Sequence, residues 1–157
     1  MSIVSDIEKL KKEKNAVILA HYYVDDDVQD VADYIGDSFY LSKVATKVSQ
    51  DRIIFAGVEF MGESAKILNP EKRVFMPDIN ADCPMAHMAD KDEILKLREQ
   101  YDDLAVVCYI NSTAELKKYS DVCVTSSNAV KIVKNLPNKN IFFIPDKLGT
   151  FCCKAMS

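Results

Sequence analysis

Short hydrophobic runs alternate with amphipathic stretches along the whole chain. In the first half, residues 5–10 open an amphipathic helix and residues 16–20 form a continuously apolar run typical of a buried strand. Further segments are predicted from the same pattern: a helical stretch at 28–49 broken near 36–38, a strand at 52–55, a helix at 60–68 and a strand at 73–76. Pro77 ends the last of these strands.

The second half repeats this alternation. Its predicted elements are a helix at 91–100, a strand at 104–108, a helix at 113–118, a strand at 121–124, a helix at 128–135 and a strand at 140–144. Strands that alternate with helices and are continuously apolar indicate an α/β fold with parallel sheets covered by helices. We expect two similar three-layer lobes, each with a three-stranded parallel sheet, over residues 1–80 and 81–157; one six-stranded sheet is the alternative.

Composition narrows the classes of protein that fit this pattern. The 157 residues include 20 Lys and Arg against 24 Asp and Glu, a formal charge of −4, and 48% are hydrophobic. Such a chain buries a core, and its mild, dispersed acidity argues against nucleic acid as a partner. No run approaches the roughly 18 apolar residues of a membrane span, and residues 1–14 lack the apolar segment of a secretory signal. We therefore expect a cytoplasmic protein that binds no membrane.

Polar residues follow the predicted strands at the points where those strands end. His21, Tyr22 and Tyr23 come after the first strand, and Tyr109, Ile110 and Asn111 come after the fourth. In open α/β sheets, ligands bind beyond the carboxyl ends of the strands, so these positions are candidates for a binding site. The alternatives are structural: His21 as a hydrogen-bonded strand-end residue, and Tyr109 and Asn111 as an edge residue and a turn former.

Two predicted helix starts carry hydroxyl groups. Residues 36–38 (Gly-Asp-Ser) place Ser38 at one start, and residues 125–128 (Thr-Ser-Ser-Asn) place Ser126 at another. Such residues cap helices, and the same geometry binds carboxylates or phosphates. Together with His21 and Asn111 they suit a small substrate with several negative charges. Residues 25–27 are assigned only a capping role, and residues 112–115 have the form of a capping box.

The five cysteines do not form a metal-binding pattern by spacing, because no Cys-x-x-Cys occurs. Cys108 and Cys123 lie in apolar strands, where a thiol is expected to behave as a small hydrophobe. Cys83 differs because it lies in a polar loop beside Pro84. Chemistry leaves Cys83 open between a structural role and that of a ligand or nucleophile.

Several of these segments together resemble the quinolinate synthase family, in the family's order and spacing. They are ILAHYY at 18–23, GDS at 36–38, FAGVEFMGESAKIL at 55–68, the segment 77–83 that ends in Cys83, VCYINS at 107–112 and TSSNAV at 125–130. The resemblance extends from near the N-terminus to residues 145–146. It implies a fold of three similar α/β lobes, of which this chain holds the first two.

The resemblance implies an enzyme of NAD biosynthesis that condenses iminoaspartate (iminosuccinate) with dihydroxyacetone phosphate to quinolinate, phosphate and water. Family members hold a [4Fe–4S] cluster by three cysteines, and Cys83 matches the first of them. His21, Ser38, the segment Tyr109, Ile110 and Asn111, and Ser126 match residues that hold the dicarboxylate substrate. Tyr23 matches a position near the condensation chemistry, and His21 or Tyr23 is the expected acid–base group.

The chain departs from the family pattern at its C-terminal end. Family members are about twice as long, and their third lobe carries the other two cluster cysteines; residues 148–157, with Cys152 and Cys153, are off-pattern. One cysteine does not hold a cluster, so the expectations are a truncated product, completion by another chain or self-association, or Cys152 and Cys153 as substitute ligands. The alternative to the enzyme is a non-catalytic dicarboxylate-binding remnant without the cluster.

Overall fold

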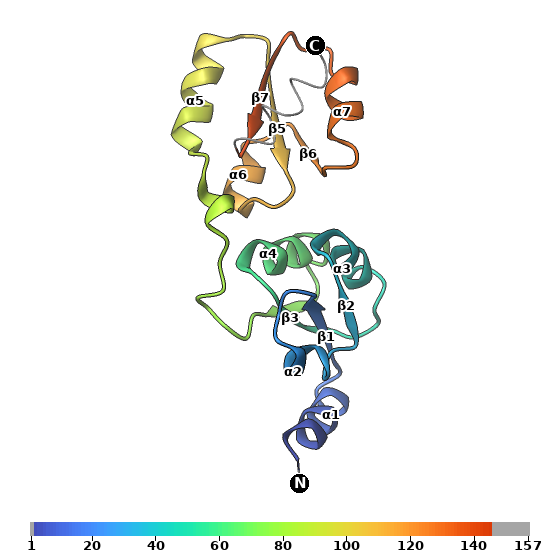
Figure 1. Ribbon diagram of the computed structural model, residues 1–157. Coiled ribbons are helices and arrows are strands. Elements are labelled where there is room, and N and C mark those ends of the chain that lie inside the picture. Colours follow the sequence, from blue (N-terminus) through green and yellow to red (C-terminus); the bar gives the residue numbers. More distant parts are fainter. Residues whose placement is uncertain (1, 146–157) are drawn as a thin grey trace. The chain divides into compact units, whose positions relative to one another are not determined.

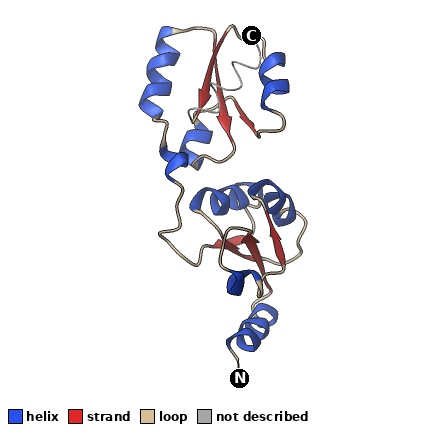
Figure 2. Ribbon diagram, viewed as in Figure 1, coloured by secondary structure: helices blue, strands red, loops and turns tan. Residues whose placement is uncertain are grey.

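The computed structural model of the chain describes residues 2–145 and divides into two compact units, Met1–Asp82 and Cys83–Ser157 (Figure 1). Each unit has helices around a parallel sheet (Figure 2). The α/β class with parallel sheets is therefore confirmed. Among the described residues, no helix has both the length and the apolar character needed to cross a membrane.

The first unit contains eight elements in strict helix–strand alternation. They are α1 (Ile3–Glu13), β1 (Ala16–His21), α2 (Asp26–Gln29), β2 (Tyr34–Gly36), α3 (Ser38–Ala45), β3 (Arg52–Ala56), α4 (Glu59–Leu68) and β4 (Arg73–Phe75). The strands form one parallel sheet in the order β2-β1-β3-β4. The central strand β1 is buried from Val17 to His21, as its apolar sequence predicts.

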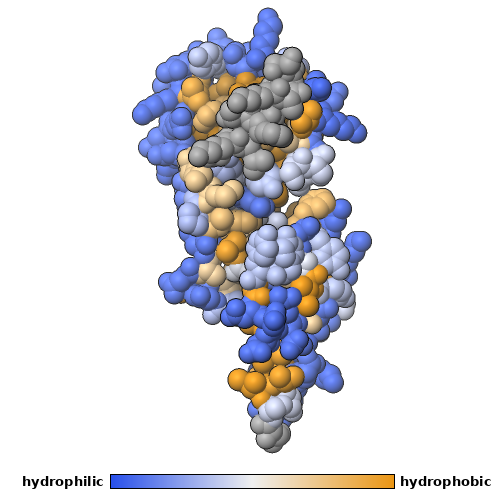
Figure 3. All heavy atoms as spheres, in the orientation of Figure 1, coloured by the Kyte–Doolittle hydropathy of each residue, from blue (hydrophilic) through white to orange (hydrophobic). Residues whose placement is uncertain are grey.

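Helices lie on both faces of this sheet. On one face, α3 packs against β1 and α4 (Figure 1). The core there includes the fully buried side chains Leu19, Leu41 and Phe55. On the other face, α1 and the sheet enclose a groove of about 360 Å³ that includes Ile18 and Ile54 in its lining. Helix α1 buries none of its residues completely, and hydrophobic side chains remain exposed in its region (Figure 3).

The second unit repeats the pattern with fewer strands. Its elements are the 3₁₀ helix η1 (Pro84–His87), α5 (Lys91–Gln100), β5 (Leu104–Tyr109), α6 (Ala114–Lys118), β6 (Val122–Val124), α7 (Ala129–Asn135) and β7 (Asn140–Ile144). The strands form a parallel sheet in the order β6-β5-β7. Successive residues of β5 serve opposite faces, so this one strand contributes to two separate cores.

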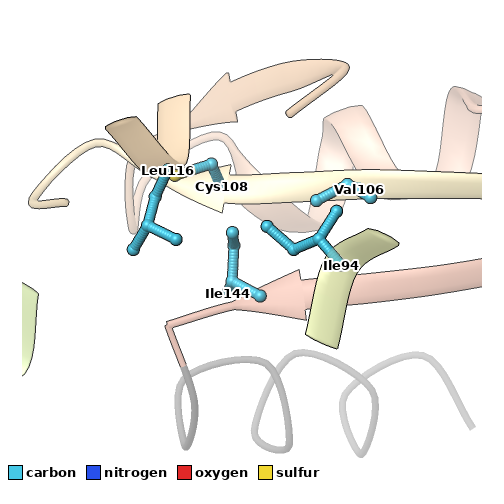
Figure 4. Packing of buried hydrophobic residues seen from close by; sticks show 5 residues of the cluster. All are labelled: Ile94, Val106, Cys108, Leu116 and Ile144. Carbon is cyan, nitrogen blue, oxygen red and sulfur yellow. The ribbon is translucent and has the colours of Figure 1, made fainter. Parts of the chain in front are cut away.

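One core lies under α5 and α6, and the other under α7. In the first, Ile94 and Leu116 from the helices meet Val106, Cys108 and Ile144 from the strands (Figure 4). The second core lies on the other face of the sheet and consists of Val107, Val124, Ala129 and Val133. The second unit is thus a three-layer arrangement.

An aspartate fixes the edge strand to the central strand in the same way in both units. In the first unit, Asp33 exchanges two hydrogen bonds with Ile18: the Ile18 N–H donates to Asp33 Oδ2 at 2.8 Å, and the Asp33 N–H donates to the Ile18 carbonyl at 2.9 Å. In the second, Asp121 and Val106 make the same pair of bonds at 2.7 and 2.9 Å. Each carboxylate thus accepts from an N–H inside the central strand, at a point that the short edge strand does not reach.

In each unit, a cation from the helix before the central strand forms an ion pair with the anchoring aspartate. Lys11 of α1 reaches Asp33 at 2.9 Å, and Arg98 of α5 reaches Asp121 at 2.9 Å. Each cation also donates a hydrogen bond to the backbone carbonyl two residues before its aspartate. Lys11 donates to the Val31 carbonyl, and Arg98 donates to the Tyr119 carbonyl. The units are therefore structural repeats in which Ile18 corresponds to Val106 and Asp33 to Asp121.

One predicted element is wrong, the helical stretch 28–49. The structure places α2, the edge strand β2 and α3 there, so the first sheet has four strands and not three. Strand β2 has only three residues, and its Tyr34 and Ile35 are exposed. It exists because β1 offers an unpaired edge, to which the register Leu19↔Tyr34 to His21↔Gly36 adds it.

Candidate functional site

His21 ends the central strand of the first unit and is almost completely buried, with 8% of its surface exposed. It pairs in register with Gly36 on β2. Its Nδ1 accepts a hydrogen bond from the Tyr23 backbone N–H at 3.3 Å. Since one ring nitrogen of a neutral imidazole accepts and the other carries the proton, this bond assigns the proton to Nε2.

Burial decides the charge of His21. Desolvation lowers the pKa of the imidazole, and the nearby Asp37 carboxylate opposes that shift without cancelling it. The side chain is therefore a neutral hydrogen-bond donor through Nε2 at neutral pH. Such a group suits the recognition of a carboxylate, because it offers a donor without the cost of burying a cation.

Tyr22 and Tyr23 surround this imidazole with aromatic rings. The Tyr22 ring stacks on His21 with centroids 4.5 Å apart, and the Tyr23 ring meets it edge-on at 4.8 Å. Tyr23 is the more exposed, at 81%. A hydrogen bond with Tyr23 raises the pKa of Tyr22, so Tyr22 keeps its proton at neutral pH.

Ser38 lies at the carboxyl end of the neighbouring strand and begins α3. Asp37 caps this helix by accepting from the Tyr40 N–H at 2.7 Å. Gly36 permits the turn, because a Cβ at this position would clash with the Tyr40 ring. The Tyr22 N–H donates to the Gly36 carbonyl at 3.2 Å, so the ends of β1 and β2 are held side by side. His21, Tyr23 and Ser38 thus share one edge of the first sheet.

In the second unit, Tyr109 ends the central strand β5, and Ile110 and Asn111 follow it. All three are partly exposed. The Ile110 N–H donates to the Val124 carbonyl at 2.8 Å, which ties this segment to the end of β6. The Ser112 hydroxyl donates to the Tyr109 carbonyl at 2.8 Å and is fully buried. The predicted capping box at Ser112 is therefore wrong by one position: Thr113 caps α6 by accepting from the Leu116 N–H.

Ser126 lies in a tight turn between β6 and α7 and is exposed. The turn is held by the Asn128 side chain, whose Oδ1 accepts from the Thr125 N–H at 2.7 Å. The Thr125 and Ser127 hydroxyls also hydrogen-bond to each other at 2.9 Å. Ser126 therefore stands beside Tyr109, Ile110 and Asn111 at the carboxyl edge of the second sheet.

The predicted residues of the two units occupy corresponding positions. Counted from the aspartate anchors, His21 corresponds to Tyr109, since they lie three residues after Ile18 and Val106. Ser38 corresponds to Ser126, since each lies five residues after its anchoring aspartate. The Tyr22–Gly36 and Ile110–Val124 backbone bonds match in the same way. Each unit thus presents one segment at the end of its central strand and one serine just after its edge strand.

Cys83 is half-buried and caps the start of η1, where the Ala86 N–H donates to its carbonyl at 2.9 Å. Iron–sulfur clusters are held by several cysteine thiolates. The other cysteines in the described part of the chain, Cys108 and Cys123, lie opposite each other on β5 and β6. The described residues therefore do not by themselves fit a [4Fe–4S] cluster, and Cys152 and Cys153 lie outside them.

Sequence reasoning missed two features of these edges. Tyr22 forms the stacked partner of His21, and only its place between two candidate residues could have indicated that role. Cys123 was expected to be a buried hydrophobe but is exposed, because β6 is an edge strand. None of the predicted site residues lines the groove beside α1.

Three curated proteins that are similar to this chain share the name quinolinate synthase. The protein from Fusobacterium nucleatum subsp. nucleatum, named quinolinate synthase, is 69% identical over 151 residues, which are 96% of this chain and 51% of that protein. Proteins of the same name from Caldicellulosiruptor saccharolyticus and Clostridioides difficile are 55% and 56% identical and cover 98% and 90% of this chain. The chain spans about half the length of these relatives.

A family model gives the same result over nearly the whole chain. The model described as quinolinate synthetase A protein matches residues 5–157, a range that includes every residue predicted for the site. The resemblance inferred from the sequence segments is thereby confirmed. The chain belongs to the quinolinate synthetase A family.

Proposed function

We propose that this chain provides two lobes of a quinolinate synthase, which condenses iminoaspartate with dihydroxyacetone phosphate in NAD biosynthesis. The observation that carries the proposal is the correspondence between the two sheet edges, His21 and Ser38 in one unit and Tyr109 and Ser126 in the other. The names of the relatives support it. The products are quinolinate, phosphate and water.

In this proposal, neutral donors bind the two carboxylates of iminoaspartate. His21 donates from Nε2, since its Nδ1 is already an acceptor. The hydroxyls of Ser38 and Ser126 and the amide of Asn111 add donors, and Tyr109 and Ile110 shape the segment that carries that amide. Neutral donors hold a small dianion in one orientation, which raises the effective concentration of its reacting carbon and nitrogen.

Tyr23 is proposed to move protons during condensation. Its hydroxyl lies on a largely exposed ring beside His21, and it shares a hydrogen bond with Tyr22. Condensation of an imine with a keto sugar phosphate requires proton transfers at carbon and oxygen. A phenol coupled to a second phenol can give a proton and take one back.

Among the described residues, Cys83 is the one proposed as a ligand to a [4Fe–4S] cluster of the complete enzyme. The described residues alone do not hold such a cluster, so no step is assigned to it here. The remaining ligands would come from outside the described residues, from a further segment or another chain. Iron content and visible absorbance of the anaerobically purified chain measure whether it binds a cluster.

A second candidate is a dicarboxylate-binding module without catalysis, because the described residues do not by themselves fit the cluster. Both candidates require binding at the sheet edges, and they differ in turnover. Quinolinate formation from iminoaspartate and dihydroxyacetone phosphate, together with stoichiometric iron, would establish the enzyme for this chain. Binding with substoichiometric iron and no quinolinate would establish the module.

Binding is tested by calorimetry with succinate, a stable four-carbon dicarboxylate, and with butyrate as the monocarboxylate control. We expect succinate to bind and butyrate to bind more weakly, because butyrate lacks the second carboxylate. Ser126→Ala should weaken succinate binding, and Ser49→Ala should not, because Ser49 is exposed in the loop before the amino end of β3. Equal binding by both variants, or no binding of succinate, would contradict both candidates.

A further inference from the structure

Two cysteines of the second unit face each other across neighbouring strands. Cys108 on β5 and Cys123 on β6 are direct partners in the parallel register. Because paired residues on adjacent strands point to the same face of the sheet, both side chains lie on the face covered by α5 and α6. Neighbouring strands lie about 4.8 Å apart, a spacing inside the range of roughly 4.4–6.8 Å between the Cα atoms of disulfide-bonded cysteines.

The two thiols differ in their access to solvent. Cys108 is fully buried between Leu116 and Ile144, whereas Cys123 on the edge strand is exposed in its unit. Each thiol shifts the pKa of the other, so the two interact. The Cys108 thiol also donates to the Tyr109 carbonyl at 3.4 Å. A small solute can therefore reach Cys123 while Cys108 stays buried beside it.

The surroundings of Cys108 favour its thiolate. The hydrogen bond from Cys123 lowers the pKa of Cys108, and the hydroxyls of Ser112 and Ser120 and the charge of Lys117 act in the same direction against burial. The same interaction raises the pKa of Cys123. The pair thus loses its first proton from Cys108 and retains the second on Cys123.

Packing does not require two thiols at these positions. The corresponding pair in the first unit is Ala20 and Ile35, which are register partners in the same place relative to the aspartate anchor. Ala20 is fully buried and Ile35 is exposed, as Cys108 and Cys123 are. The fold therefore accepts ordinary apolar side chains here, and the two sulfurs need another explanation.

We propose that Cys108 and Cys123 form a redox-active dithiol, which hydrogen peroxide oxidises to a disulfide within the second unit. A proton passes from Cys123 to the Cys108 thiolate, and the exposed Cys123 thiolate that results attacks the peroxide. An S–O bond forms, the O–O bond breaks, and the leaving hydroxide takes the proton back from Cys108 to become water. The Cys108 thiolate then attacks the sulfenic sulfur: the S–S bond forms, the S–O bond breaks, and the hydroxide that leaves takes a proton from solvent to become a second water. The two thiols lose two electrons, which reduce the peroxide.

Mass spectrometry of the whole chain after peroxide treatment tests this proposal. Trypsin separates the two cysteines, because Cys108 falls in the peptide 99–117 and Cys123 in the peptide 119–131. The expected product is these two peptides linked and lighter by two hydrogen atoms than their sum, formed in the native protein and reversed by dithiothreitol. Oxidation in urea should give severalfold less of this product, because unfolding separates the strands.

Variants identify the partners. Cys123→Ser should abolish the linked pair and leave Cys108 open to alkylation after denaturation, while Cys83→Ser should leave the pair unchanged. Further oxidation of Cys123 to sulfinic acid with Cys108 still reduced would overturn the proposal. So would linkage of either cysteine mainly to another one, or an equal yield in urea. The native and urea comparison uses the unmodified chain, so it decides the matter even where a variant does not fold.

Discussion

The backbone N–H of Tyr23 donates to Nδ1 of His21 over 3.3 Å. This bond leaves the proton of the neutral imidazole on Nε2. Desolvation of the ring lowers its pKa, which keeps it neutral around pH 7. One local contact therefore sets both the tautomer and the direction in which His21 donates.

The tautomer can be read directly by nitrogen-15 NMR. We expect His21 to show a protonated Nε2 and an unprotonated Nδ1 at neutral pH, and to titrate below about 6.5, the ordinary value for histidine. The chain has two histidines, so His87→Gln leaves a single imidazole and assigns the signals. Protonated Nδ1, or a pKa above the ordinary value, would refute this assignment.

Stability should depend on pH through the same residue. The folded-state pKa of His21 lies below its unfolded value, so the unfolded chain binds the proton more tightly. The contribution of His21 to the free energy of unfolding is thus present above about pH 6.5 and is lost as pH falls through the folded-state pKa. Urea unfolding at pH 7 and pH 5 should show a smaller loss for His21→Gln than for the unmodified chain. An equal loss would mean that burial does not set the charge.

The aspartate anchors should contribute to stability in both units. Asp33→Ala and Asp121→Ala each remove an acceptor from a central-strand N–H, together with an ion pair. We expect each to lower the free energy of unfolding by about 1 to 2 kcal/mol. Asp102→Ala is the matched control, an exposed aspartate before β5, and should change little. Urea denaturation measures all three, and an effect no larger than the control's would show that the anchors are dispensable.

Alanine substitutions at two neighbouring residues of α5 should lower the free energy of unfolding by very different amounts. Ile94 is fully buried in the core under α5 and α6 (Figure 4). Leu95, the next residue, is 43% exposed. Ile94→Ala should destabilise the protein by about 2 to 5 kcal/mol, because it leaves a cavity. Leu95→Ala removes a side chain of the same size from the same helix without leaving that cavity, so a much smaller loss is expected in thermal or urea unfolding. Equal losses would contradict the assignment of this core.

The hydrophobic pattern was sufficient to predict the long elements. Strand β7 and helix α5 have the predicted bounds, because their apolar residues are continuous or periodic. Strand β2 could not be predicted this way, since three residues with exposed side chains carry no such signal. It is held by pairing with β1 and by Asp33, and both are tertiary contacts.

The sequence indicated which residues form the candidate site, but not the hydrogen bonds and exposures of their side chains. The rule that ligands bind at the carboxyl ends of parallel strands selected His21, Asn111 and Ser126 before any coordinates. The tautomer of His21 and the exposure of Cys123 depend on a backbone bond and on the place of β6 at the sheet edge. The sequence does not encode those two facts in any local pattern.

Asp33 and Asp121 bind the central strands three residues before His21 and Tyr109, the residues that end those strands. The residues that hold each central strand to its edge strand are therefore different from the candidate site residues at its end. Substitution of the terminal residues of β1 and β5 leaves both aspartate anchors in place, because each anchor binds its strand three residues earlier. The same backbone course therefore carries an imidazole at the end of one central strand and a phenol at the end of the other.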